Sequence, residues 1–150
     1  MGQQQLLLLV LSTVIVGLAT VAGIQAFSSN QAQASQDALV QKGTSIASDI
    51  QGLAGKPTQM GGIDLSSSVP KGATIANRLG YDTASVPAEG AGSGATCDII
   101  GSGGSPKEGT IDILCTSSNA PQDVRIGVTP SNANDGKSST EVISTSFETP

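Results

Sequence analysis

Two hydrophobic patterns follow one another along the first third of the chain. Between residues 6 and 24 almost every position is apolar, which is typical of a helix whose whole circumference is surrounded by lipid or protein. The run is long enough to cross a bilayer, which needs roughly 20 apolar residues. The residues that interrupt the run are all small enough to lie in such a helix: Ser12, Thr13, Gly17, Thr20 and Gly23.

Beyond Ile24 the apolar positions become periodic. They recur at intervals of three, four or seven with polar residues between them, which predicts an amphipathic continuation of the helix. No proline occurs before Pro57, and Gly52, Gly55 and Pro57 together form a helix stop. We therefore expect one unbroken helix of about 50 residues, roughly 75 Å long at 1.5 Å per residue. The periodic apolar residues are Phe27, Ala34, Ala38, Leu39, Ile46, Ile50 and Leu53.

After Pro57 the composition changes to Gly, Ser, Thr and Pro with short apolar runs. Residues 57–95 show little periodicity and are expected to form loops, with a brief strand near 63–65 and a turn of helix near 74–79. Four β-branched segments then follow: ATCDIIG, GTIDILCTS, DVRIGVTP and STEVISTSF. Turn-forming clusters separate them, and GSGGSPKEG and PSNANDGKS are suitable hairpin connections.

These patterns predict an α+β fold in two parts. Residues 1–55 form the long N-terminal helix, apolar all round in its first half and amphipathic in its second half. Residues 56–150 form a small head rich in Ser, Thr and Gly, built on an antiparallel β-sheet whose apolar face packs on the helix. The helix residues expected to make this contact are Leu39, Ile46, Ile50 and Leu53.

The two cysteines, Cys97 and Cys115, fall in the first two of the four β segments. In the first predicted hairpin, Ile111, Ile113 and Cys115 share one face, as do Cys97 and Ile99, so the two sulfurs could meet across the strands. An even cysteine count fits one disulfide in an oxidising compartment. Two reduced, buried thiols are the alternative.

The composition disfavours catalysis and nucleic-acid binding. The chain has no His, which removes the commonest general acid or base near neutral pH, so we expect no enzyme and no cofactor. Its net charge is −5, and its seven Lys and Arg residues are scattered rather than gathered into a stripe that could neutralise phosphates.

Three kinds of motif have competing interpretations. Aligning SNANDGKSSTEV with a calcium loop puts Ala133 and Val142 at ligand positions, so a plain Asp-Gly turn is favoured. GAGSGATC and GSGGSPKEG do not lead from a strand into a phosphate-binding helix and are expected to be loops. No Asn-x-Ser/Thr acceptor occurs, whereas the many Ser and Thr residues of the loops are candidate acceptors for O-linked glycans.

The N-terminal segment departs from a secretory signal peptide. No cationic side chain precedes the apolar run, and the candidate cleavage site Ala32-Gln33-Ala34 lies beyond it across a polar stretch. No charged residue occurs before Asp37. We therefore expect the apolar helix to be retained.

The chain resembles the type IV pilin superfamily, which includes bacterial pilins, pseudopilins, archaeal pilins and archaellins. The resemblance rests on the apolar helix MGQQQLLLLVLSTVIVGLATVAGIQAF, its amphipathic extension through Leu53, and the small cysteine-bearing β region. It implies a subunit that waits in the membrane, is trimmed by a dedicated peptidase, and is drawn by an assembly machinery into a filament whose core is made of the apolar helices. It also places Gln5 where many bacterial members carry a glutamate, if Met1 is the mature start; processing after Gly2 would place Leu7 there.

Our leading hypothesis is a structural subunit of an extracellular type IV pilus-like filament, with a membrane-embedded state before assembly. Its partners would be copies of itself, the membrane and the assembly machinery. The alternative is a single-pass anchored domain that binds a partner at the cell surface and does not polymerise. The residues expected to form the filament core or to lie in the membrane are Leu6, Leu7, Leu8, Leu9, Val10, Leu11, Val14, Ile15, Val16, Leu18, Val21, Ile24 and Phe27.

Overall fold

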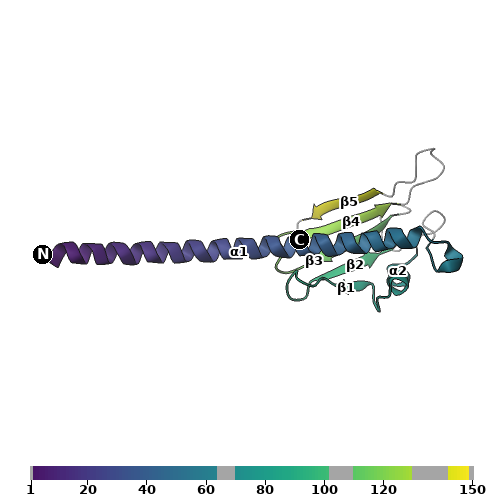
Figure 1. Cartoon of the computed structure of the whole chain (residues 1–150), viewed down its shortest axis with the longest axis horizontal. Helices are drawn as coiled ribbons and strands as arrows, with labels where there is room; N and C mark the ends of the chain where they lie inside the picture. Colours follow the sequence, from purple (N-terminus) through teal and green to yellow (C-terminus); the bar gives the residue numbers. More distant parts are fainter. Residues whose placement is uncertain (1, 64–69, 102–109, 130–141, 149–150) are drawn as a thin grey trace.

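A computed structural model describes residues 2–63, 70–101, 110–129 and 142–148. One long helix, α1 (Gly2–Ala54), projects far beyond a small head, and the N-terminus lies at its free end (Figure 1). The predicted α+β fold is confirmed. The remaining elements are η1 (Thr58–Met60), α2 (Gly72–Leu79), β1 (Ser85–Pro87), β2 (Thr96–Ile100), β3 (Ile111–Thr116), β4 (Asp123–Thr129) and β5 (Val142–Glu148).

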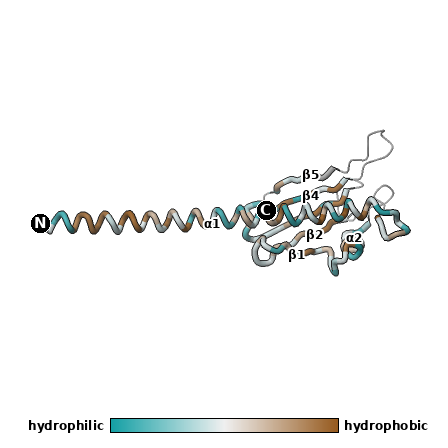
Figure 2. The backbone as a smooth tube through the Cα atoms, in the orientation of Figure 1, coloured by the Kyte–Doolittle hydropathy of each residue, from teal (hydrophilic) through white to brown (hydrophobic). Residues whose placement is uncertain are grey.

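Helix α1 is continuous over 53 residues, about 80 Å at 1.5 Å per residue. Figure 2 shows the change along its length, from a strongly hydrophobic stretch near the N-terminus to alternating colours beside the head. Gly52, part of the predicted stop, lies inside the helix, which ends after Ala54. The chain then turns through Gly55, whose N–H donates to the carbonyl of Gln51 at 3.0 Å.

The head is built on a five-stranded antiparallel sheet in the order β1-β2-β3-β4-β5. Because every strand pairs with its neighbour in sequence, the sheet is a simple meander. The four β segments expected from the sequence form β2 to β5. Of the two predicted hairpin connections, GSGGSPKEG lies outside the described residues after Gly101, and PSNANDGKS with its Asp-Gly turn lies wholly outside them. The segment considered as a calcium loop also lies outside them up to its last residue, Val142.

The buried face of the sheet packs on the second half of α1. Buried residues alternate along β2 and β3, as expected for strands with one covered face. On α1 the contact is made at Leu39, Ile46, Ile50 and Leu53, which are all buried. The opposing residues from the central strands are Ile111, Ile113, Val124, Ile126 and Val128.

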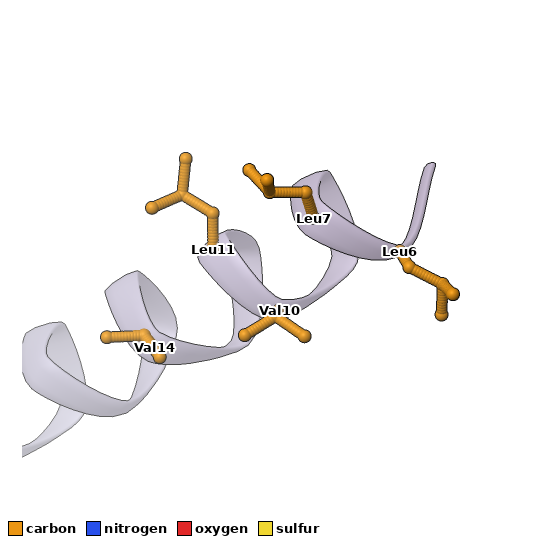
Figure 3. Close-up of a pocket in the computed structure, with 5 residues that line it drawn as sticks. All are labelled: Leu6, Leu7, Val10, Leu11 and Val14. Atoms are coloured by element: carbon orange, nitrogen blue, oxygen red, sulfur yellow. The ribbon is translucent and has the colours of Figure 1, made fainter. Parts of the chain in front are cut away.

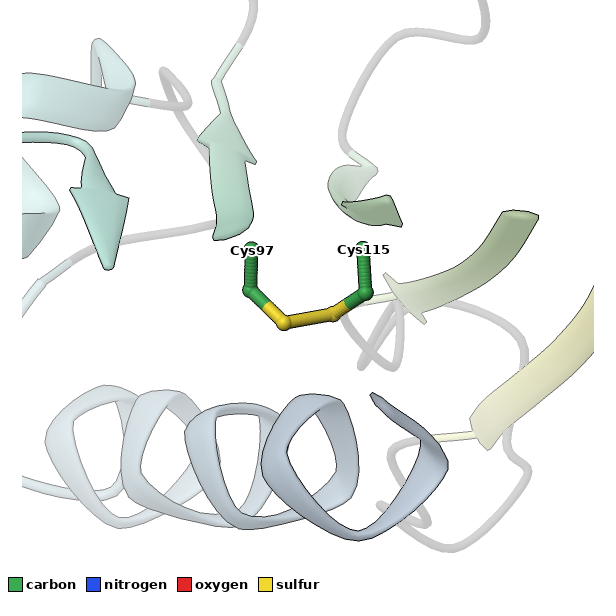
Figure 4. Close-up of a disulfide and its surroundings, with 2 residues drawn as sticks. All are labelled: Cys97 and Cys115. Atoms are coloured by element: carbon green, nitrogen blue, oxygen red, sulfur yellow. A yellow bond between two sulfur atoms is a disulfide. The ribbon is translucent and has the colours of Figure 1, made fainter. Parts of the chain in front are cut away.

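A disulfide joins Cys97 on β2 to Cys115 on β3, confirming the pairing considered from the sequence. The two residues are direct cross-strand partners with Cα atoms 3.9 Å apart. Figure 4 shows the bridge on the face of the sheet that lies toward the helix. Both residues are fully buried, so the bridge is part of the core.

The segment between α1 and the sheet differs from expectation at two points. The predicted strand at 63–65 was wrong at Ile63, whose N–H donates instead to the carbonyl of Leu53 at 3.3 Å and satisfies a group at the end of α1; Leu65 lies outside the described residues. The predicted turn at 74–79 is helix α2, which begins earlier, at Gly72. Arg78 of α2 donates to the carbonyl oxygens of Gly61 and Gly62 and ties the two regions together.

Candidate functional site

The most unusual surface of the molecule is the projecting part of α1. Every residue from Gly2 to Gln31 is exposed, so this half of the helix is covered by no other part of the structure that is described. Its large apolar side chains are exposed by 51% at Leu11 to 72% at Phe27. These side chains include all the predicted core or membrane residues: Leu6, Leu7, Leu8, Leu9, Val10, Leu11, Val14, Ile15, Val16, Leu18, Val21, Ile24 and Phe27.

The free energy of exposing these apolar side chains to water indicates what must surround the projecting helix. Burying a Val, Leu, Ile or Phe side chain is worth about 1.5–3 kcal/mol relative to leaving it exposed. For the whole set the sum is on the order of tens of kcal/mol, which exceeds the roughly 5–15 kcal/mol by which a domain is stable. The projecting helix therefore requires an apolar environment that the described residues do not supply.

The hydroxyl side chains within the apolar run do not oppose burial. The hydroxyl groups of Ser12, Thr13 and Thr20 each donate to a backbone carbonyl three or four residues earlier, at 2.8 Å. They are satisfied within the helix, so none needs water. A Cβ added at Gly17 or Gly23 would meet nothing within 4 Å among the described residues, and neither glycine interrupts the helix.

Near the N-terminus the side chains form an open apolar depression. It is lined by Leu6, Leu7, Val10, Leu11 and Val14, as Figure 3 shows. Leu7, Val10, Leu11 and Val14 have the spacing i, i+3, i+4 and i+7, which is the arrangement that receives a side chain of a neighbouring helix. The depression offers shape and dispersion contacts and no polar group.

The predicted N-terminal assembly position is only partly described. Gln5 lies within α1 with an exposed side chain, whereas Met1 lies outside the described residues. The first turn of α1 contains no acidic residue. An amide at position 5 can donate and accept hydrogen bonds but cannot form an ion pair.

Helix α1 is long and apolar enough to cross a membrane by length and composition. No residue of its most hydrophobic stretch is buried inside the molecule. A signal sequence near an N-terminus has the same properties. The helix is thus compatible with membrane anchoring or with a signal sequence.

The charged groups that the structure describes lie on the head and on the part of α1 beside it. On the sheet, Arg125 lies 3.6 Å from Asp112 and 3.3 Å from Glu148, which links β3, β4 and β5. Lys42 of α1 lies over the ring of Tyr81, 5.9 Å from its centroid. Within the described ranges, no group of three or more His, Cys, Asp or Glu residues could hold a metal ion.

One residue that positions the helix was absent from the expected contact set. Gly43 is buried, and a Cβ built on it would lie 2.6 Å from Ile126 Cδ1 and 3.1 Å from Cys115 Sγ. It completes the series 39, 43, 46, 50 and 53, spaced by four and three. The spacing of Leu39 and Ile46 indicates a further buried position at 43. It was missed because glycine has no side chain and so does not count as an apolar residue in the pattern.

No family model, curated protein or solved structure matches the chain. The layout itself, a long apolar N-terminal helix whose second half packs on a small antiparallel sheet, is like that of pilins.

Proposed function

We propose that the chain is a structural subunit of an extracellular helical filament of the type IV pilus kind, and that it acts by polymerisation rather than catalysis. The observation that supports this most directly is the bare apolar half of α1, in which every residue from Leu6 to Ile24 is exposed. A straight helix of this kind can be surrounded on all sides only by lipid or by other helices. Copies of the chain supply such helices.

In this proposal the apolar half has two successive environments. Before assembly it lies in the membrane, where a span of roughly 20 apolar residues is sufficient. During assembly it leaves the lipid for a core made of the same helices from neighbouring copies. Because lipid tails are as apolar as leucine, close packing rather than hydrophobicity favours this transfer.

The shape of the helix surface is suited to that packing. The depression at Leu7, Val10, Leu11 and Val14 can receive a side chain of a neighbouring helix. Small residues such as Ala19 and Gly23 allow helices to approach closely. The heads would then lie outside the helical core, where their Ser- and Thr-rich loops are accessible to glycosylation.

Polar substitution in the apolar half tests the proposal. Leu9→Asp and Val16→Asp each place a carboxylate on the exposed surface of α1, and we expect cells producing either variant to have no surface filaments by electron microscopy. Val16→Ile is the matched control, because it changes the same side chain but keeps it apolar. Normal filaments in both Asp variants would overturn the proposal.

A second measurement separates a polymer from a membrane anchor. The anchored alternative is favoured by the length of the apolar run, which is enough for one span. Wild-type chain purified in detergent should form filaments, or large helical oligomers, when the detergent is removed. A chain that stays monomeric under these conditions, with no filaments on the cell surface, would support the anchored domain instead.

A further inference from the structure

A short segment of α1 separates the apolar half from the head, and we call residues 25–34 the neutral collar. It is about 15 Å long at 1.5 Å per residue. The first buried residue of the helix, Ser35, follows it directly. The collar is polar but carries no charge, since the first charged residue of the chain is Asp37. Its polar residues are Gln25, Ser28, Ser29, Asn30, Gln31 and Gln33.

The polar residues of the collar lie all round the helix. Successive residues are rotated by about 100°, so Gln31 and Gln33 lie on nearly opposite sides, and both are exposed. A helix that is polar on all sides either bridges two packed regions through solvent or is stabilised by pairs of side chains four residues apart, ion pairs among them. The neutral collar has no charged side chain with which to form one.

A membrane surface does not account for this composition either. Segments that flank a membrane span are typically rich in Lys and Arg on the cytoplasmic side, and in Trp and Tyr at both interfaces. The neutral collar contains none of these four residue types, and Phe27 is its one aromatic residue. A lone anchor would tolerate charge at these positions, since they lie beyond the apolar run.

Burial among uncharged neighbours does account for the polar but uncharged composition of the neutral collar. An amide carries both donors and acceptors, so amides on facing helices can satisfy one another when water is excluded. A charged side chain in the same place would need a counter-charge, and burial without one is very unfavourable. The collar also continues the apolar half on one unbroken helix, so copies packed side by side along the apolar half also meet at their collars.

We infer that the neutral collar is buried against the collars of neighbouring copies, where Gln and Asn amides form hydrogen bonds between subunits. This inference rests on the proposed polymerisation and extends the helix contact beyond the apolar run. It identifies the interaction surface as residues 25–34 and the partner as a second copy of this chain.

The isosteric substitutions Gln31→Glu and Gln33→Glu test the inference on opposite sides of the helix. Each adds one negative charge with almost no change of shape. We expect each full-length variant to integrate into the membrane like the wild type but to give at least about tenfold fewer surface filaments, because an ionised carboxylate is excluded from a dry contact. Gln59→Glu is the matched control, since Gln59 is exposed in η1, which follows the opposite end of α1.

The outcomes distinguish this inference from the proposal on which it rests. Loss of filaments in both collar variants, with normal filaments in Gln59→Glu and normal membrane integration in all three, supports the buried collar. Normal filaments in the collar variants, when Leu9→Asp abolishes them, would overturn the buried collar and leave polymerisation intact. Absence of filaments from the wild type would instead overturn polymerisation itself, and this inference with it.

Discussion

At the scale of single residues, Gly43 determines how closely α1 approaches the sheet. Its hydrogen faces Ile126 Cδ1 and Cys115 Sγ, which lie 2.6 Å and 3.1 Å from a Cβ built at this position. Cys115 is held by the disulfide and Ile126 is fully buried, so a side chain at position 43 would have to displace Ile126 Cδ1 within the core. A larger side chain would push the helix away from the core.

Substitution of Gly43 should therefore destabilise the head. We expect Gly43→Leu to lower the free energy of unfolding by about 2 kcal/mol or more, because overpacking a core typically costs about 1–3 kcal/mol. Thermal denaturation followed by circular dichroism in detergent measures the change. Gly52→Leu is the matched control: Gly52 lies in the same helix with open space around it, and the gain in helix propensity should stabilise it by about 0.5–1 kcal/mol. Equal effects at both positions would contradict the role assigned to Gly43.

The ion pairs of Arg125 make a smaller contribution. The Arg125 side chain is 32% exposed and that of Glu148 is 50% exposed, so solvent screens their attraction. We expect Glu148→Gln to reduce stability by no more than about 1 kcal/mol. The same denaturation experiment at low and high salt checks this, and the difference between variant and wild type should shrink as salt is added. A loss of several kcal/mol, unchanged by salt, would show that the pair contributes to the core.

At the scale of elements, the hairpin of β2 and β3 is cross-linked near its open end, one pair in from Thr96 and Thr116. Its disulfide closes a loop with a sequence separation of 18 residues, for which the loss of unfolded-state entropy predicts about 3 kcal/mol of stabilisation. The double variant Cys97→Ala, Cys115→Ala should therefore unfold at a clearly lower temperature than the wild type. Adding a reductant to the wild type during denaturation should give a similar shift. A double variant that melts like the wild type would show that side-chain packing alone holds the hairpin.

The sequence predicted the elements whose pattern is local. The all-round apolar run and the later periodicity predicted α1 as one helix, and alternation with β-branched residues predicted β2 to β5. Strand β1 was missed because it has three residues, Ser85–Pro87, and is defined by its pairing, with Val86 opposite Cys97. The start of α2 at Gly72 was missed for a similar reason, because this glycine packs closely against β2. A Cβ built on it would lie 1.8 Å from the Ile99 carbonyl oxygen. Both depend on contacts between segments distant in the chain.

At the scale of the whole molecule, the head and the projecting helix are separable. Among the described residues, all those that are buried lie at or after Ser35, and residues 2–31 are exposed throughout. We expect a chain that begins at Ser28 to be soluble without detergent and monomeric by light scattering. Its free energy of unfolding should lie within about 1 kcal/mol of that of the full-length chain, since no buried contact is removed. Aggregation of the truncated chain, or loss of its β-sheet circular dichroism, would show that the first half of α1 contributes to folding.

The proposed assembly should bury the apolar half of α1 and leave the far end of the helix exposed. In the single chain Val16 is 64% exposed and Gln59, just beyond the far end of α1, is also exposed. In sheared filaments freed of lipid, a thiol introduced by Val16→Cys should react with a water-soluble maleimide at least about tenfold more slowly than one introduced by Gln59→Cys, because a thiol in a dry helical core is not reached by the reagent. The native cysteines do not interfere, since both are in the disulfide. Unfolding the filaments in denaturant provides the control, in which the two thiols should react at similar rates. Equal rates in intact filaments would place the apolar half of α1 in contact with water and would contradict a core built from it.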